Sequence, residues 1–268
     1  MELDDENVLP PGLTLESLFS RNGYRAMMAL KRLPPEEYFA NRDPVEILRQ
    51  RSALLETRPQ DFVCEPVGEG DCDAVIRFAG SFANVNHART FRELGLAWEP
   101  DFVLLHRAES AAIAGGCVCF PTGWSLGEKQ GRALAFAHSP VPGLNTQLGP
   151  SVERFFVHLK TADCYQRSNW SLTSSRQMNQ RPQDEIPEIE SDCDLARTFL
   201  RVEWQALTAI DDLRVIFGIR VYHLTLASVR RQGESARLLA ENLRTMPEEM
   251  VRYKRLSRCR DRIVEMLG

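Results

Sequence analysis

The feature that most constrains the fold is a set of three long strand candidates in the second half of the chain. They span residues 164–174, 198–209 and 213–226. In "FLRVEWQAL", polar and apolar residues alternate with a period of two, which is typical of a strand that packs one face on a core. "AIDDLR" (209–214) predicts a tight hairpin turn between the second and third segments. These segments therefore predict an antiparallel sheet.

Helical patterns surround these strands. We expect helices at residues 14–31, 43–59, 73–86, 125–138, 151–160 and 234–267, the last one interrupted at Pro247, and two further strands at 101–110 and 111–121. Residues 180–194 are polar, acidic and rich in breakers, which predicts a surface loop. The sum is an α+β fold with helices at both ends of the sheet and on one face. We expect a single domain over 1–268, with an N-terminal arm at 1–12 and a C-terminal helical extension at 234–268.

Composition and charge exclude some classes of protein. The chain has 268 residues, 43% of them hydrophobic, and a net charge of −4, which argues against a nucleic-acid-binding protein. The N-terminal "MELDDENVLPPG" is acidic and lacks the apolar core of a signal peptide. No apolar run approaches the roughly 20 residues that span a bilayer. The seven cysteines are scattered, without a C-x-x-C pair. We expect a cytoplasmic protein with reduced thiols that binds neither nucleic acid nor membrane.

The stretch "SLGEKQGRALAFAHSPVPG" (125–143) contains the first candidate site residue, His138. Ser125 and Glu128 have the spacing of a capping box, so a helix is expected to run from 125 to 138. His138 would be its last residue before two prolines. One interpretation is a C-terminal cap, because the helix dipole favours the protonated ring there. The other is an axial ligand, because "ALAFAH" is apolar enough to pack on a planar hydrophobic cofactor. The local pattern leaves both open.

Polar side chains on two of the strands form the second candidate site. Alternation places four residues on one face of the first strand and three on one face of the second: Tyr165, Arg167, Asn169 and Ser171, then Arg201, Glu203 and Gln205. This polar face is either exposed to solvent or lines a cavity under a curved sheet. The other histidines are isolated and are interpreted as ordinary polar residues: His87, His106, His158 and His223.

Five blocks occur in an order that resembles a known family. They are "CVCFPTGWSLGEKQGRALAFAHSPVPGLN", "RSNWSLTSS", "LRVEWQAL", "GIRVYHLTL" and "MPEEMVRYK". Together, over about residues 25–255, they resemble the alpha subunit of haem-dependent oxidative N-demethylases, also called dimethylamine monooxygenase. The resemblance implies a PAS-like fold, in which a curved antiparallel sheet holds haem b against a helix. It also implies that His138 is the axial ligand of the iron.

The family oxidises a small secondary amine with dioxygen, as a haem monooxygenase. Its electrons come from a partner reductase subunit that carries FMN and a 2Fe-2S centre, and this chain has neither a dinucleotide fingerprint nor cluster-type cysteine spacing. The resemblance places His138, Arg167 and Asn169 at the haem, with Arg167 as a donor toward oxygen. It places Arg201, Glu203 and Tyr222 at the amine, with Glu203 as the anion that holds an alkylammonium.

Two departures from the family pattern bear on the substrate. Trp204 stands where the family strand usually has a second arginine, and His223 follows Tyr222 where the family usually has a proline-containing turn. The main alternative is a non-catalytic haem-based gas or redox sensor with the same pocket, and a further one is a relative that binds no haem. Glu203 separates the first two, because a gas sensor has no use for a carboxylate poised to bind an ammonium.

Overall fold

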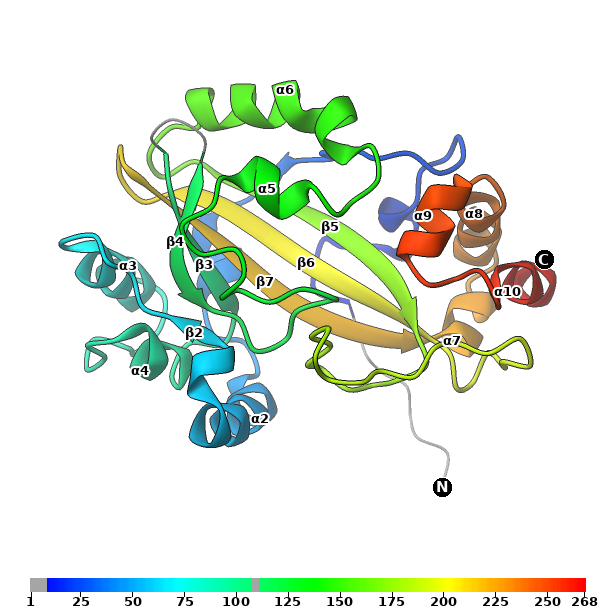
Figure 1. Ribbon diagram of the computed structural model, residues 1–268, viewed down its shortest axis with the longest axis horizontal. Coiled ribbons are helices and arrows are strands. Elements are labelled where there is room, and N and C mark those ends of the chain that lie inside the picture. The colour runs from blue at the N-terminus through cyan, green and yellow to red at the C-terminus, as the bar shows by residue number, and fades with distance from the viewer. Residues whose placement is uncertain (1–8, 108–110) are drawn as a thin grey trace.

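The computed structural model describes residues 9–107 and 111–268, and it has an α+β fold (Figure 1). Within these residues, seven strands form one antiparallel sheet in the order β1-β5-β6-β7-β3-β4-β2. The strands are β1 (Lys31–Arg32), β2 (Val63–Cys64), β3 (Asp101–His106), β4 (Ala112–Cys117), β5 (Cys164–Thr173), β6 (Phe199–Ala209) and β7 (Arg214–Thr225). The predicted fold class is confirmed.

The helices pack on both faces of the sheet and gather at its ends. They are α1 (Pro35–Phe39), α2 (Pro44–Thr57), α3 (Asp71–Gly80), α4 (Phe91–Gly95), α5 (Leu134–His138), α6 (Leu144–His158), α7 (Leu226–Arg231), α8 (Gly233–Arg244), α9 (Glu248–Tyr253) and α10 (Arg260–Leu267), with short 3-10 helices η1 (Leu15–Leu18) and η2 (Pro59–Asp61). In Figure 1, α5 and α6 lie across one face of the sheet, while α2 to α4 and α8 to α10 gather at opposite ends. None of the helices in the described part of the chain could cross a membrane.

The three long strands lie where the sequence predicts them. β6 and β7 form a hairpin in which Ala209 pairs with Val215, and the pairing continues to Phe199 and Thr225. β5 pairs with the other side of β6 over its whole length. Alternation is a local property of the sequence, which is why these strands and the turn at 209–214 could be predicted within a residue or two.

The two faces of the sheet pack on different cores. The face named here the helical-end face carries Trp204, Ala206 and Ile216 under α1 to α4, and Trp170, Leu200 and Val202 under α8 to α10. The opposite face, named here the α5 face, carries Val103, Leu105, Ile113, Leu207 and Val215, which pack with Phe156 and Leu159 of the α6 region. Each fully buried side chain of this size stabilises the fold by about 1.5–3 kcal/mol.

The predicted helix at 125–138 is wrong over most of its length. Only Leu134–His138 is helical, and residues 127–131 form turns. Gly131 has φ +73°, which a helix cannot contain, and Ala133 bridges Ala112 at the edge of β4. Ser125 caps no helix, since its hydroxyl donates to Gln183 at 2.9 Å. Pairing with a distant strand thus outweighs the local helical pattern.

The N-terminal region is also less helical than predicted. Residues 14–31 contain only the 3-10 helix η1, and Gly23 has φ +79° where the predicted helix would continue. Most of the predicted arm, residues 1–8, lies outside the described residues. The C-terminal extension agrees with the prediction, because α8 to α10 fill it and the chain breaks at Pro247, which precedes α9.

Candidate functional site

The α5 face of the sheet changes from apolar to polar along β6. Leu207 packs with the residues under α5 and α6, whereas Gln205, Glu203 and Arg201 follow at every second position on the same face. All three polar residues are buried. These three side chains are therefore not exposed to solvent, which was one of the two interpretations left open by the sequence.

His138 is the last residue of α5, the helix whose Leu134 and Ala137 pack against the apolar part of this face. Burial, together with the positive charges of Arg167 and Lys129, lowers the pKa of His138 to about 4. The ring is therefore neutral near pH 7 and keeps a lone pair, as a metal ligand requires. The charged-cap interpretation needs a protonated ring and does not agree with this shift. The carbonyls of α5 are instead capped by Lys129, whose Nζ donates to Ala137 at 2.8 Å, and by Asn145, whose Nδ2 donates to Ala135 at 2.8 Å.

Arg167 reaches the same region from β5, where it pairs with Gln205. Its Nε is buried and has no hydrogen-bond partner. Burial lowers the pKa of Arg167, and the negative charge of Glu203 opposes that shift. A buried guanidinium donor without an acceptor costs free energy, so this side chain is poised to receive a ligand atom.

Glu203 is the buried carboxylate of the site, with 6% of its surface exposed. Its Oε1 accepts a hydrogen bond from the Thr122 hydroxyl at 2.5 Å, and its Oε2 accepts one from Gln205 Nε2 at 2.7 Å. No cation forms an ion pair with it among the described residues. A buried carboxylate without an ion pair attracts a positively charged ligand.

Arg201 lies next to Glu203 on β6, but its donors are already used. Its guanidinium donates to four backbone carbonyls, those of Phe120, Pro121, Gln177 and Met178. Nε donates to the Thr122 hydroxyl at 2.8 Å, and Nη1 lies 3.1 Å from His223 Nε2. Since a guanidinium has five N–H donors, none is left for an amine substrate or its counterion. The guanidinium of Arg201 therefore links β6 to two loops, one around Phe120 and one around Met178.

The structure does not bring Tyr222 to this cluster. The register of β6 and β7 pairs Glu203 with Val221, so Tyr222 faces the opposite side of the sheet. There it packs against the cores beneath the helices, and burial raises its pKa. The predicted contact of Tyr222 with an amine bound at Glu203 therefore conflicts with the register. Asn169 is on the α5 face opposite Glu203, and it is exposed.

Two residues at the site were missed by the sequence analysis. Thr122 joins Arg201 to Glu203 through one hydroxyl, although it comes from the loop after β4. Lys254 follows α9, and its charge interacts with that of Glu203. Both lie inside the quoted blocks, in "CFPTGW" and "MVRYK". Their only sequence signal is that they belong to these blocks, because nothing local links them to β6.

The donors present suit an iron porphyrin. The part of the chain that the structure describes offers a neutral imidazole, a buried Nε of Arg167 without an acceptor, and the apolar cluster of the α5 face. Leu134 and Ala137 of α5, the helix that ends at His138, pack against the apolar cluster that contains Leu207 of β6. A flat hydrophobic ring with charged edge groups has matching partners here.

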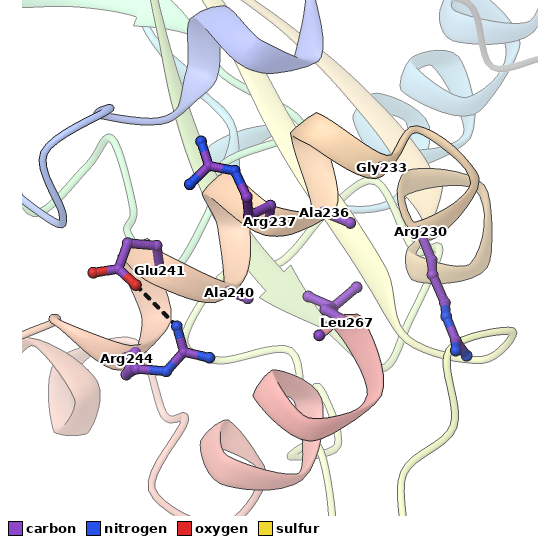
Figure 2. A pocket seen from close by; sticks show the side chains of 9 residues that line it. Arg230, Gly233, Ala236, Arg237, Ala240, Glu241, Arg244 and Leu267 are labelled. Carbon is purple, nitrogen blue, oxygen red and sulfur yellow. Dashed lines mark hydrogen bonds and ion pairs between the residues drawn. The ribbon is translucent and has the colours of Figure 1, made fainter.

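A separate hollow lies away from this site, beside α8 and the end of α10 (Figure 2). It encloses about 310 Å³ and is lined in part by Arg230, Arg237 and Arg244. Arg244 pairs with Glu241 at 2.9 Å, and all three arginines are exposed. None of the site residues predicted from the sequence lines this hollow.

Comparison with protein families matches residues 21–264 to the family described as haem-dependent oxidative N-demethylase, alpha subunit-like. The match covers nearly the whole chain, including β5, β6 and the segment with His138. It agrees with the resemblance drawn from the five sequence blocks. The chain belongs to the haem-dependent oxidative N-demethylase alpha subunit-like family.

Proposed function

We propose that this chain is the haem b-binding subunit of a monooxygenase that removes a methyl group from a small secondary amine. The observation that carries the proposal is Glu203, a buried carboxylate that forms no ion pair with any described residue and lies on the same sheet face as Arg167. Family membership supports the dependence on haem and the reaction class. Dimethylamine is the simplest substrate that fits.

His138 is the residue that would hold the iron. Its ring is neutral, and its helix is short, covered by α6 on one side and held by Lys129 and Asn145. When bound, haem would supply the iron centre at which dioxygen oxidises the methyl carbon. The apolar side chains under α5 and α6 would exclude water from that centre.

Glu203 would hold the alkylammonium form of the substrate. Its carboxylate is oriented by Thr122 and Gln205, so it does not need to reorganise when a cation arrives. The cation would neutralise a buried charge, and this gain favours a charged amine over a neutral molecule of the same size. A gas sensor would gain nothing from such a carboxylate.

Arg167 would donate hydrogen bonds toward the dioxygen molecule. Its Nε has no hydrogen-bond partner among the described residues, and a guanidinium stays charged at all physiological pH values. The positive charge of Arg167 helps to lower the pKa of His138, and the negative charge of Glu203 acts on the pKa of Arg167. Arg167 would therefore connect the oxygen and amine ends of the site.

Several wider aspects of the proposal rest on the family. The sheet with α5 and α6 across one face agrees with a PAS-like haem domain. Electrons would come from a partner reductase subunit with FMN and a 2Fe-2S centre, in the cytoplasm. An alpha subunit-like family supports the existence of a partner.

Absorbance spectroscopy of the purified protein tests the proposal. We expect a Soret band in the wild type, its loss or strong shift in His138→Ala, and no change in His158→Ala. His158 is the matched control because it ends α6 as His138 ends α5, and its Nδ1 is only bonded to the Arg154 carbonyl. An unchanged spectrum in His138→Ala would show that another residue binds the iron.

The amine assignment is tested by titrating dimethylamine into the haem-loaded protein. The wild type should show an amine-dependent spectral change, and Glu203→Gln should lose it while keeping its haem. Glu128→Gln is the control, since Glu128 is exposed and its Oε1 is bonded to Gln183. If no small secondary amine perturbs the wild-type spectrum, a sensor becomes the better account. For Arg167→Ala, we expect oxygen dissociation to rise about ten- to a hundredfold.

A further inference from the structure

We propose that Lys129 binds a propionate of the haem, beside the turn of α5 that ends at His138. The inference rests on the proposed function and deepens it, because it names a residue that recognises the edge of the cofactor, whereas His138 would bind only the iron. The propionates of haem b are carboxylates at neutral pH. Beside an apolar cluster, such a charge costs free energy unless a cation or water meets it.

The first observation is the position of the Lys129 ammonium group. Its Nζ donates to the carbonyl of Ala137, the residue before His138, at 2.8 Å. The same Nζ lies 5.9 Å from the centre of the Trp124 ring. Both Ala137 and Trp124 pack against the apolar cluster of the α5 face. The cation therefore lies at the border of this cluster, bonded to the residue next to the proposed iron ligand.

The second observation is that this ammonium group has donors to spare and no carboxylate partner. An ammonium carries three N–H donors, and the bond to Ala137 uses one of them. Among the described residues, no carboxylate forms an ion pair with Lys129. The neighbouring Glu128 accepts instead from Gln183 Nε2 at 3.0 Å. Because the Lys129 side chain is half-buried, an anion would stabilise it more than it would stabilise a fully exposed cation.

The third observation is that the other cation of this segment lies on the outer side of α5. The guanidinium of Arg132 is 5.3 Å from the centre of the Phe136 ring, and both side chains are exposed. Successive residues of an α-helix are rotated by about 100°, so Phe136 and His138 point to nearly opposite sides of α5. Arg132 is therefore a basic residue of the same segment that a haem held by His138 would not meet.

An anion at Lys129 is compatible with a cation at Glu203. The carboxylate of Glu203 comes from β6 and is oriented by Thr122 and Gln205. A propionate at Lys129 would neutralise the lysine and leave this carboxylate available for an ammonium ion. The two ends of the site would thus bind ligand groups of opposite charge.

A purely structural role for Lys129 is the competing explanation. In that case its ammonium only caps the last turn of α5 through the Ala137 carbonyl. Lys129→Gln distinguishes the two roles, because an amide can still donate to a carbonyl but carries no charge. Lys129→Arg keeps both the donor and the charge. Arg132→Gln is the matched control, since it removes a cation from the outer side of the same segment.

The experiment compares haem b with its dimethyl ester, in which the propionates are blocked. The full-length wild type and each variant are loaded with either haem, and the rate of haem loss to excess apomyoglobin is measured. Lys129→Gln should lose haem b about tenfold faster than the wild type and the ester at the wild-type rate, as expected for a half-buried ion pair. Lys129→Arg and Arg132→Gln should stay close to the wild type with both haems.

The outcomes separate this inference from the proposed function. Faster loss of haem b alone from Lys129→Gln supports the inference. Equal acceleration with both haems, no acceleration, or the same selective effect in Arg132→Gln overturns it. If Lys129→Gln takes up neither haem, the wild type and Lys129→Arg decide, because the inference requires both to hold haem b more tightly than its ester and is overturned if they do not. A wild type that takes up neither haem refutes the proposed function itself.

Discussion

Arg201 is expected to be essential for folding and not for contact with the amine, so Arg201→Met should destabilise the protein strongly. The guanidinium is fully buried and donates to four backbone carbonyls, and it also contacts Thr122 and His223. Removing one partner from a buried charged network costs about 3–5 kcal/mol. For a chain of this size, such a loss lowers the midpoint of thermal unfolding by about 6–20 °C.

Urea denaturation followed by tryptophan fluorescence measures this loss directly. Glu203→Gln is the comparison, since it changes a neighbouring buried charge on the same face of β6 without removing any hydrogen-bonded heavy atom. We expect Arg201→Met to lower the free energy of unfolding several times more than Glu203→Gln does. If Arg201→Met unfolds within about 1 kcal/mol of the wild type but no longer responds to amine, then Arg201 binds substrate and the reasoning from its hydrogen bonds is wrong.

Two other predictions follow from the core and from a buried histidine. Burial, together with the charges of Arg201 and Arg176, lowers the pKa of His223 to about 3. Because the unfolded chain binds this proton more tightly, His223 stabilises the fold fully only above about pH 6.5, and roughly 1.5 kcal/mol is lost between pH 6.5 and 5. His223→Gln should flatten the stability profile in that window, and an equally steep profile would contradict the shift. Gly218→Ala would place a Cβ 2.6 Å from an aromatic ring carbon of α1, which should cost about 1–3 kcal/mol. Gly127→Ala is the control, as it meets nothing within 4 Å, and equal stability of the two variants would refute the packing argument.

The sequence predicts the sheet well and the helix above it poorly. The strands β5 to β7 follow from alternation, which depends only on neighbouring residues. The prediction of a helix at 125–138 is wrong because Ala133 pairs with Ala112 and Gly131 takes a left-handed conformation. Neither effect is visible in a local pattern of apolar spacing. Long-range pairing decides this segment.

The site could be predicted in part for the same reason. Glu203 and Arg167 lie on one face, as alternation requires, and the register confirms it. The placement of Tyr222 could have been checked from the sequence, because the tight turn fixes which residues of β7 share a face with Glu203. The sequence could not show that all the N–H donors of Arg201 are used, because their acceptors come from loops around Phe120 and Met178.

The hydroxyl of Thr122 has a consequence for which amines Glu203 can hold. The hydroxyl accepts from Arg201, so its single hydrogen goes to Glu203 Oε1, while Gln205 donates to Oε2. A carboxylate has about four lone-pair positions, and two of them are therefore occupied. A dialkylammonium ion carries two N–H groups, which matches the two positions that remain. A trialkylammonium ion has one N–H group and would leave one of these positions unmet. In this site, selectivity among amines would depend on the number of N–H groups on the ammonium ion as much as on its size.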